Sequence, residues 1–161
     1  MTIAVGDRLP EAKFIIPAGD ELAEKTTSDV FAGKKIALFA VPGAFTGTCT
    51  NTHLPGFLSS FDTFKAKGVD EIVCVAVNDP FVLKAWALAT GADGAITFLS
   101  DGNAEFTKAL GLDFDGSAKN FGTRSKRYSM LVEDGIVKSL NVEEVNSNAV
   151  ASSAENLLKQ L

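Results

Sequence analysis

Two short, continuously apolar runs constrain the fold more than any other feature of this 161-residue sequence. They are IALFAV at 36–41 and IVCVAV at 72–77, the latter within a strand expected at 71–77 that begins with Glu71. Each run is short and bounded by turn residues, so each predicts a strand buried on both faces. Between them, Phe57, Phe61 and Phe64 form one apolar helical stripe. This strand–helix–strand unit predicts two parallel strands joined by a right-handed crossover.

Turn and cap signals place the remaining elements. Asp79-Pro80 is a helix cap followed by proline at the first helical position, and 133–135 is a hairpin turn, Glu-Asp-Gly. The helix that begins near Thr46 is expected to be interrupted at 54–56, where Pro55 should kink it or restart it. We expect strands at 13–16, 95–99, 128–132 and 136–140. Helices are expected at 80–90, 103–110 and 154–160, and a capping box at 152–155 opens the last of them. The segment 18–35 is polar, with one helical turn at 28–31, and 112–125 is expected to be a loop.

The predicted order is a β-α-β half followed by a β-β-α half, with additions at the N-terminus. Helices would cover both faces of one sheet, and the hairpin would add an antiparallel edge. This is an α/β, thioredoxin-like arrangement. No repeat, linker or low-complexity run interrupts it, so residues 1–161 are expected to form one domain. The fold hosts many functions and by itself assigns none.

Charge and composition argue against several classes of function. Twenty acidic and fifteen basic side chains give a net charge of -5, which disfavours nucleic acid and anionic membranes as partners. There is no run of about 20 apolar residues and no signal-peptide pattern, so we expect a cytoplasmic protein. Two cysteines and one histidine are too few for a common four-ligand zinc site. No metal or other cofactor is expected.

The chemistry is expected in the segment 41–57, VPGAFTGTCTNTHLPGF, which joins a central strand to a helix. Ligands bind at this edge of open α/β sheets. Cys49 falls in the first helical turn, where unpaired backbone N–H groups and the helix dipole favour a thiolate. Thr46 lies three residues earlier and could place a hydroxyl beside the sulfur. A buried, unreactive cysteine with capping threonines fits the same position, and position alone does not decide between the two.

Three motifs resemble the peroxiredoxins, specifically the peroxiredoxin-five subgroup, which is also called plant type II. They are PGAFTxxCxxxHLPGF at 42–57, GVDEIVCVAVNDPF at 68–81 and KRYSMLVEDGIV at 126–137. The resemblance covers essentially the whole chain. It implies a thiol peroxidase that reduces hydrogen peroxide and alkyl hydroperoxides through a cysteine sulfenic acid, in antioxidant defence and redox homeostasis.

The resemblance also implies roles for individual residues. Cys49 would be the peroxidatic cysteine, and Thr46 would hydrogen-bond both its thiolate and the incoming peroxide. Arg127 would orient and polarise the peroxide. Pro42 would shield the sulfur from water, and Pro42 and Gly43 would bind the substrate. A homodimer formed through surfaces near the active site is implied as well.

Cys74 has two interpretations. It fits a small apolar core residue on a central strand, and by resemblance it could be a resolving cysteine that attacks oxidised Cys49. The resolving cysteine that other relatives carry near the C-terminal helix is absent, because 151–153 is Ala-Ser-Ser. This absence favours a one-cysteine cycle completed by an external thiol. By resemblance, that thiol is glutathione, a glutaredoxin or a thioredoxin.

Two other functions compete with a peroxidase. His53 lies four residues after Cys49 and suggests a cysteine hydrolase, but no third orienting residue supports that reading. The resemblance makes His53 a structural or active-site-rim residue. The second competitor is a redox sensor or chaperone-like protein that uses oxidation of Cys49 as a switch. Arg124 is a weaker candidate than Arg127 for orienting the peroxide, and it also fits loop packing or a surface charge. Lys126, Glu143, Glu144 and Glu155 are expected at the solvated surface, and Trp86 in the core.

Overall fold

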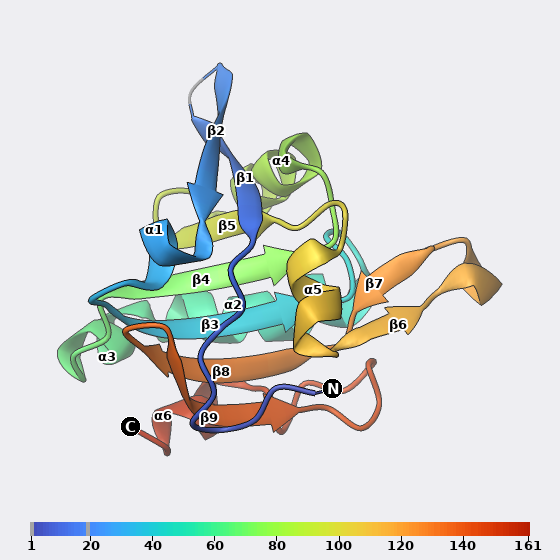
Figure 1. Cartoon of the computed structure of the whole chain (residues 1–161). Helices are drawn as coiled ribbons and strands as arrows, with labels where there is room; N and C mark the ends of the chain where they lie inside the picture. The colour runs from blue at the N-terminus through green and yellow to red at the C-terminus, as the bar shows by residue number, and fades with distance from the viewer. Residues whose placement is uncertain (1, 19) are drawn as a thin grey trace.

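A seven-stranded mixed sheet forms the centre of the molecule (Figure 1). The computed structural model describes residues 2–18 and 20–161; Met1 and Gly19, which belong to the predicted domain and to the predicted polar segment, lie outside the described residues. In spatial order the strands are β2 (Glu21–Thr26), β1 (Lys13–Ala18), β5 (Ile96–Ser100), β4 (Glu71–Ala76), β3 (Lys35–Val41), β8 (Tyr128–Glu133) and β9 (Ile136–Val142). β3, β4 and β5 are parallel, and β8 is antiparallel to β3. A parallel centre with an antiparallel hairpin is the predicted arrangement.

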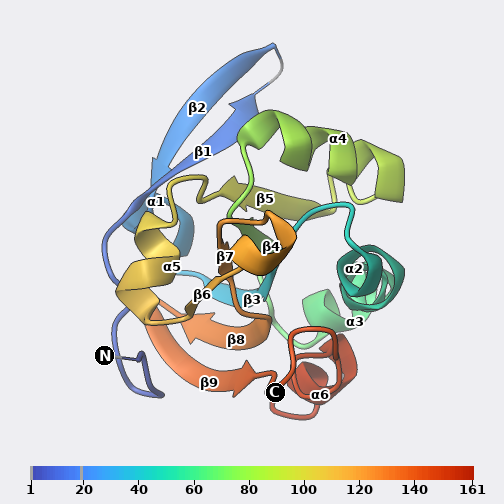
Figure 2. The same cartoon turned by 90° about the vertical axis from the view of Figure 1, so that its right-hand side faces the viewer.

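Helices cover both faces of the sheet (Figure 2). One face carries α2 (Leu54–Ser59), α3 (Phe61–Ala66), α4 (Pro80–Thr90) and α6 (Ala154–Leu158), and the other carries α1 (Thr27–Phe31) and α5 (Glu105–Leu110). Each face has its own apolar layer. Phe57 and Trp86 belong to the first layer, and Phe31 and Phe106 to the second. Within the described chain, no helix is both long enough and apolar enough to cross a membrane.

The position of β3 between two apolar layers explains why its sequence is continuously apolar. Ala37, Phe39 and Val41 belong to one apolar layer, and Ile36, Leu38 and Ala40 belong to the other. Alternate side chains of a strand point to opposite faces, so a strand covered on both faces needs an apolar residue at every position. The strand predictions for 36–41 and 71–77 are confirmed.

Local signals also set the ends of helix α4 and of the β8–β9 hairpin. Asp79 accepts a hydrogen bond from the backbone N–H of Val82 at 2.9 Å, and Gly91 ends the helix at φ 75°. Asp134 and Gly135 both have positive φ, as a two-residue hairpin turn requires. The helices predicted at 103–110 and 154–160 are present as the slightly shorter α5 and α6.

The prediction for 18–35 is wrong in part. Residues 21–26 form β2, which pairs along its length with β1. Its sequence, ELAEKT, is largely exposed at the edge of the sheet and has no apolar alternation. Backbone pairing with β1 therefore stabilises β2, and a local pattern does not reveal such pairing. The helical turn predicted at 28–31 is confirmed as α1, which begins with a capping box between Thr26 and Asp29.

The segment 112–125 is also more regular than predicted. β6 (Asp113–Asp115) and β7 (Thr123–Ser125) form a small antiparallel sheet, with a 3-10 turn at Ser117–Lys119 between them. This lobe projects from the body of the molecule (Figure 1). Strands of three residues are too short to produce a recognisable period of two.

A new α-helical segment, α2, starts at Leu54 with Pro55 in its first turn, which is the restart that Pro55 predicts. The helix that follows β3 is α-helical from Gly47, widens to a π-helical turn at Cys49–His53 and continues as α2. A separate break lies at Ser60, between α2 and α3. Proline lacks the N–H that an α-helix would need at residue 55. The wider turn, closed by the Leu54 N–H bonding the Cys49 carbonyl, lets the helix pass through Pro55.

Candidate active site

Cys49 lies just after the end of β3, in the first turn of the following helix, as predicted. Parallel strands β3, β4 and β5 all end at this side of the sheet. The side chain of Cys49 is fully buried within the apolar layer that α2 covers. Ligands of open α/β sheets bind beyond the carboxyl ends of such strands, so this thiol is in the expected place for chemistry.

Two side chains contact the sulfur of Cys49. Thr46 Oγ1 and Arg127 Nη2 each lie 3.0 Å from Sγ. One group is a neutral hydroxyl and the other is a cation, and both can donate a hydrogen bond. A negatively charged sulfur is the acceptor that matches this pair of donors.

The hydroxyl of Thr46 has a second partner. Its Oγ1 also lies 2.7 Å from the carbonyl oxygen of Gly43. A hydroxyl carries one proton, so it can donate to only one of these acceptors at a time. Thr46 can therefore donate to a thiolate at Cys49, or accept from a thiol while it donates to Gly43.

Arg127 is held by hydrogen bonds on its backbone and its side chain. Its Nε donates to the carbonyl oxygen of Asn146 at 2.9 Å, and its backbone N–H donates to Asn146 Oδ1 at 3.2 Å. Its Nη1 lies 2.9 Å from His53 Nδ1. Only 2% of the residue is exposed. None of the ion pairs among the described residues includes Arg127, so no carboxylate partner offsets its charge near the sulfur.

His53 joins Arg127 to the C-terminal part of the chain. Its Nε2 lies 2.9 Å from the carbonyl oxygen of Ser152. A carbonyl can only accept and a guanidinium can only donate, so we assign the proton to Nε2 and leave Nδ1 as the acceptor. Burial, and then the charge of Arg127, lower the pKa of His53 to about 3. The imidazole is therefore neutral at pH 7.

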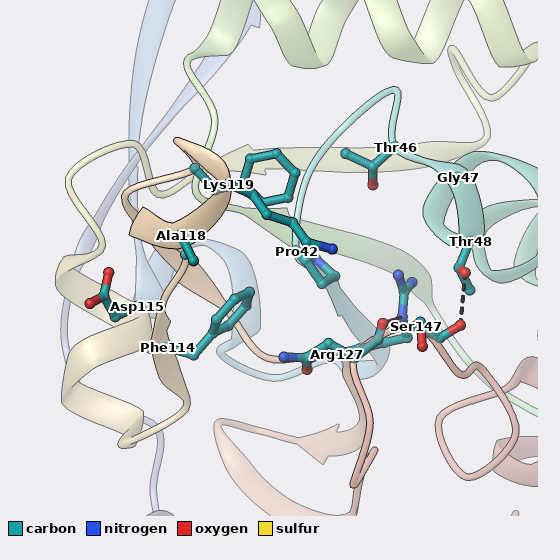
Figure 3. A pocket seen from close by; sticks show the side chains of 13 residues that line it. Pro42, Thr46, Gly47, Thr48, Phe114, Asp115, Ala118, Lys119, Arg127 and Ser147 are labelled. Atoms are coloured by element: carbon teal, nitrogen blue, oxygen red, sulfur yellow. Dashed lines mark hydrogen bonds between the residues drawn. The ribbon is translucent and has the colours of Figure 1, made fainter.

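A cavity of about 440 Å³ opens beside these groups. In Figure 3, Pro42 lies between Thr46, Thr48 and Arg127 on one side and Phe114 and Ala118 of the β6–β7 lobe on the other. Cys49 does not line the cavity, because Thr46 and Arg127 cover it. A small molecule that enters the cavity therefore meets these two donors before it reaches the sulfur.

Gly43 and Arg124 hold the loop at one wall of the cavity. Arg124 Nη1 donates to the carbonyl oxygen of Pro42 at 3.2 Å, and its Nε donates to that of Phe121 at 2.8 Å. A Cβ at Gly43 would lie 2.7 Å from Arg124 Nη1 and 3.3 Å from Thr46 Cγ2. Gly43 does not line the cavity; its lack of a side chain lets Arg124 and Thr46 approach. Arg124 thus has the loop-packing role given as its other reading.

Comparisons with known proteins agree with this geometry. The sequence profile of the Redoxin family matches residues 4–158. Peroxiredoxin-2E-2, a chloroplastic protein of Oryza sativa subsp. japonica, is 51% identical over 99% of this chain and 73% of its own. Peroxiredoxin-2C of the same plant is 46% identical over 99% and 98%. Reduced Prx3 of Vibrio vulnificus, solved in complex with hydrogen peroxide, has a TM-score of 0.93 and 47% identity, over 98% of each chain.

The chain belongs to the peroxiredoxin family. This peroxiredoxin has the thioredoxin-like fold of its structural neighbours. It is a thiol-dependent peroxidase with an antioxidant function, and it uses a peroxide as substrate and a thiol as reductant. The relatives include chloroplastic and mitochondrial proteins, so membership of the family does not specify a compartment.

Cys74 of this peroxiredoxin lies in the middle of β4, between β3 and β5. Its side chain is fully buried in the same apolar layer as Cys49, and both thiols are free. Burial, and then the nearby Cys49, raise the pKa of the Cys74 thiol. The prediction of a core residue is confirmed. Trp86 is also buried as predicted, and its indole N–H donates to Thr50 Oγ1 at 3.1 Å.

Glu143 was expected at the surface, and that prediction is wrong. It is 7% exposed, and its Oε2 accepts hydrogen bonds from the backbone N–H and the hydroxyl of Ser152, both at 2.6 Å. This also means that Ser152 does not cap α6; Ser153 caps it by accepting from the N–H of Asn156. Glu143 and Ser152 are nine residues apart, and Arg127 and Asn146 are nineteen apart. No periodic pattern reveals contacts at such spacings, so sequence reasoning missed Glu143, Asn146 and Ser152.

Proposed function

We propose that Cys49 is the peroxidatic cysteine and that Thr46 and Arg127 are the catalytic groups beside it. The observation that carries this proposal is the pair of 3.0 Å contacts that Thr46 Oγ1 and Arg127 Nη2 make with Sγ. Both donors also line the neighbouring cavity. A peroxide bound there would contact the same groups that contact the sulfur.

The proposed reaction is a displacement at oxygen. The thiolate of Cys49 attacks the terminal oxygen of the peroxide, an S–O bond forms, and the O–O bond breaks. The sulfur becomes a sulfenic acid, and the departing oxygen takes up a proton and leaves as water or an alcohol. Arg127 stabilises charge on the departing oxygen, and Thr46 hydrogen-bonds the thiolate and then the peroxide.

We assign the wall of the cavity to the substrate. Pro42 lines it and excludes water from the sulfur, which supports the role that the family resemblance implies. Gly43 contributes through its carbonyl oxygen, which can accept the Thr46 proton when the sulfur does not. The aromatic Phe114 and Phe121 give part of the cavity an apolar wall, which suits the organic part of an alkyl hydroperoxide.

An external thiol completes the proposed cycle. A first thiol attacks the sulfenic acid, releasing water and forming a mixed disulfide with Cys49, and a second thiol reduces that disulfide. Glutathione, a glutaredoxin or a thioredoxin would supply these thiols. The position of Cys74 in the middle of a central strand supports this route over an internal disulfide.

The assembly and compartment belong to the same proposal. Residues 1–161 form one domain of a cytoplasmic homodimer that associates near the active site. Phe45 and Phe81 support this dimer surface because they are 54% and 65% exposed. Phe45 has φ 64°, an unfavourable value for a bulky residue. The Ala44 N–H donates to Asn78 Oδ1 at 2.9 Å and ties the two loops together.

Steady-state peroxide consumption tests the proposed cycle. Hydrogen peroxide and an alkyl hydroperoxide are each supplied with glutathione and glutaredoxin, or with thioredoxin and its reductase. Sustained turnover with at least one reductant is expected. A single stoichiometric oxidation with no turnover in either system would instead indicate a redox switch.

A further inference from the structure

A closed ring of hydrogen bonds surrounds Arg127. The backbone N–H of Glu143 donates to the carbonyl oxygen of Arg127 at 3.0 Å. The Glu143 carboxylate accepts from Ser152, the Ser152 carbonyl accepts from His53, and His53 Nδ1 accepts from Arg127 Nη1. The ring therefore begins at the backbone of Arg127 and returns to its guanidinium. Its four members are all buried, with exposures of 0% to 7%.

The ring places a carboxylate near the site but not on the guanidinium. A carboxylate bonded directly to Arg127 would offset its charge and compete with the sulfur and the peroxide. The groups that hold Arg127 are instead the neutral His53 imidazole and the backbone carbonyl of Asn146. Nη2 is thus left to Cys49.

Glu143 is the only charged member of the ring besides Arg127. Its carboxylate makes two short hydrogen bonds to Ser152, and these bonds fix the carbonyl that orients His53. Charge-assisted hydrogen bonds are stronger than neutral ones, so this contact is well suited to hold the Ser152 backbone in one position. Ser152 and His53 are 99 residues apart in the chain, so their hydrogen bond exists only in the folded protein.

We propose that Glu143 is a positioning residue for the reaction, which fixes the guanidinium of Arg127 against Cys49 through Ser152 and His53. This inference rests on the proposed roles of Cys49 and Arg127. Glu143 touches neither the cavity nor the sulfur, so its effect on the reaction passes through the ring.

Paired substitutions test the proposal. Glu143→Leu removes both acceptor oxygens, Glu143→Gln keeps one, and Glu144→Leu is the matched control at the exposed neighbouring glutamate. The rate constant for Cys49 oxidation by hydrogen peroxide is measured for each variant, and the thiolate fraction is followed by ultraviolet absorbance. Glu143→Leu is expected to lower the rate by about tenfold to a hundredfold, as displaced catalytic groups do. Glu143→Gln should fall between Glu143→Leu and the wild type, and Glu144→Leu should match the wild type.

The chain has a single histidine, so nitrogen NMR reports on His53 without ambiguity. The wild type is expected to show the neutral form with the proton on Nε2. Glu143→Leu is expected to lose this single pattern, because Ser152 no longer holds the ring, whereas Glu144→Leu should keep it. If Glu143→Leu does not fold, Glu143→Asp replaces it, since the shorter side chain cannot keep both contacts with Ser152 in place.

Three results would overturn the proposal: a wild-type His53 with the proton on Nδ1, a Glu143 variant with the rate and the histidine signals of Glu144→Leu, and a slow variant whose histidine signals are unchanged. If the wild type itself shows no peroxidase activity, that result would count against the proposed function instead. In that case the histidine signals would still show whether Glu143 holds the ring.

Discussion

Arg127 donates a hydrogen bond to His53, and both residues are almost completely buried. The acceptor, Nδ1, lies 2.9 Å from Nη1, although 74 residues separate the two in the chain. A neutral imidazole orients the guanidinium without cancelling its charge. His53 does not line the cavity, but it helps to orient the positively charged guanidinium that contacts Cys49.

Cys49→Ser is expected to abolish peroxidase turnover and to leave the fold intact. Serine is similar in size to cysteine but cannot form a sulfenic acid, and its hydroxyl can still bond with Thr46 and Arg127. Peroxide consumption and far-ultraviolet circular dichroism are measured together. Substantial turnover by a folded Cys49→Ser variant would show that another group reacts with peroxide.

Thr46→Val and Arg127→Met are each expected to slow the reaction with peroxide much more than they lower the thiolate fraction. A cysteine with a reference pKa of about 8.5 is already about 3% thiolate at pH 7, so ionisation accounts for only about 2 kcal/mol of the barrier. Losing a transition-state hydrogen bond costs about a hundredfold or more. Stopped-flow oxidation of Cys49 measures the rate, with the exposed Thr52→Val as control. A rate loss merely proportional to thiolate loss would remove the polarising role from that residue.

His53→Gln is expected to weaken the dependence of stability on pH. The pKa of His53 is about 3 in the folded protein and about 6.5 when unfolded, so between these values the unfolded state binds more protons. The stability from the neutral imidazole is complete above pH 6.5 and is lost as the pH falls toward 3. At pH 4 this loss is about 3 kcal/mol.

Urea unfolding at pH 7, 5 and 4 measures the effect of His53→Gln. The other titrating groups are common to both proteins, so the difference between the two curves isolates His53. The variant is expected to be less stable than the wild type at pH 7 and to lose less stability on acidification. Parallel curves would mean that His53 titrates normally in the folded protein.

Cys74→Ser is expected to keep nearly full turnover with glutathione or glutaredoxin. Cys74 lies on a central strand, and exposing it requires an opening that approaches the global stability of about 5–15 kcal/mol. Peroxide-treated wild type without thiol should therefore gain oxygen at Cys49, as sulfenic and then sulfinic acid. Intact mass spectrometry distinguishes this gain from the loss of two hydrogens. A dominant two-hydrogen loss that disappears in Cys74→Ser would make Cys74 the resolving cysteine.

The sequence alone determined the parts of this protein that depend on neighbours in the chain. The apolar runs at 36–41 and 72–77 specify strands buried on both faces, and Asp79 and Gly91 specify the ends of a helix. The position of Cys49 in a first helical turn follows from the same local signals. Resemblance of motifs, rather than periodicity, pointed to Arg127.

Only the tertiary structure decided which distant groups meet at Cys49. β8 pairs with β3 and so brings Arg127 to the helix that carries Cys49, while the segment after β9 brings Asn146 and Ser152 to the same place. β2 and the β6–β7 pair likewise exist through backbone pairing. Glu143 is predicted at the surface because carboxylate side chains are rarely buried. Its burial is possible because Ser152 donates two hydrogen bonds to its carboxylate, and this contact forms only when the assembled fold brings the two residues together.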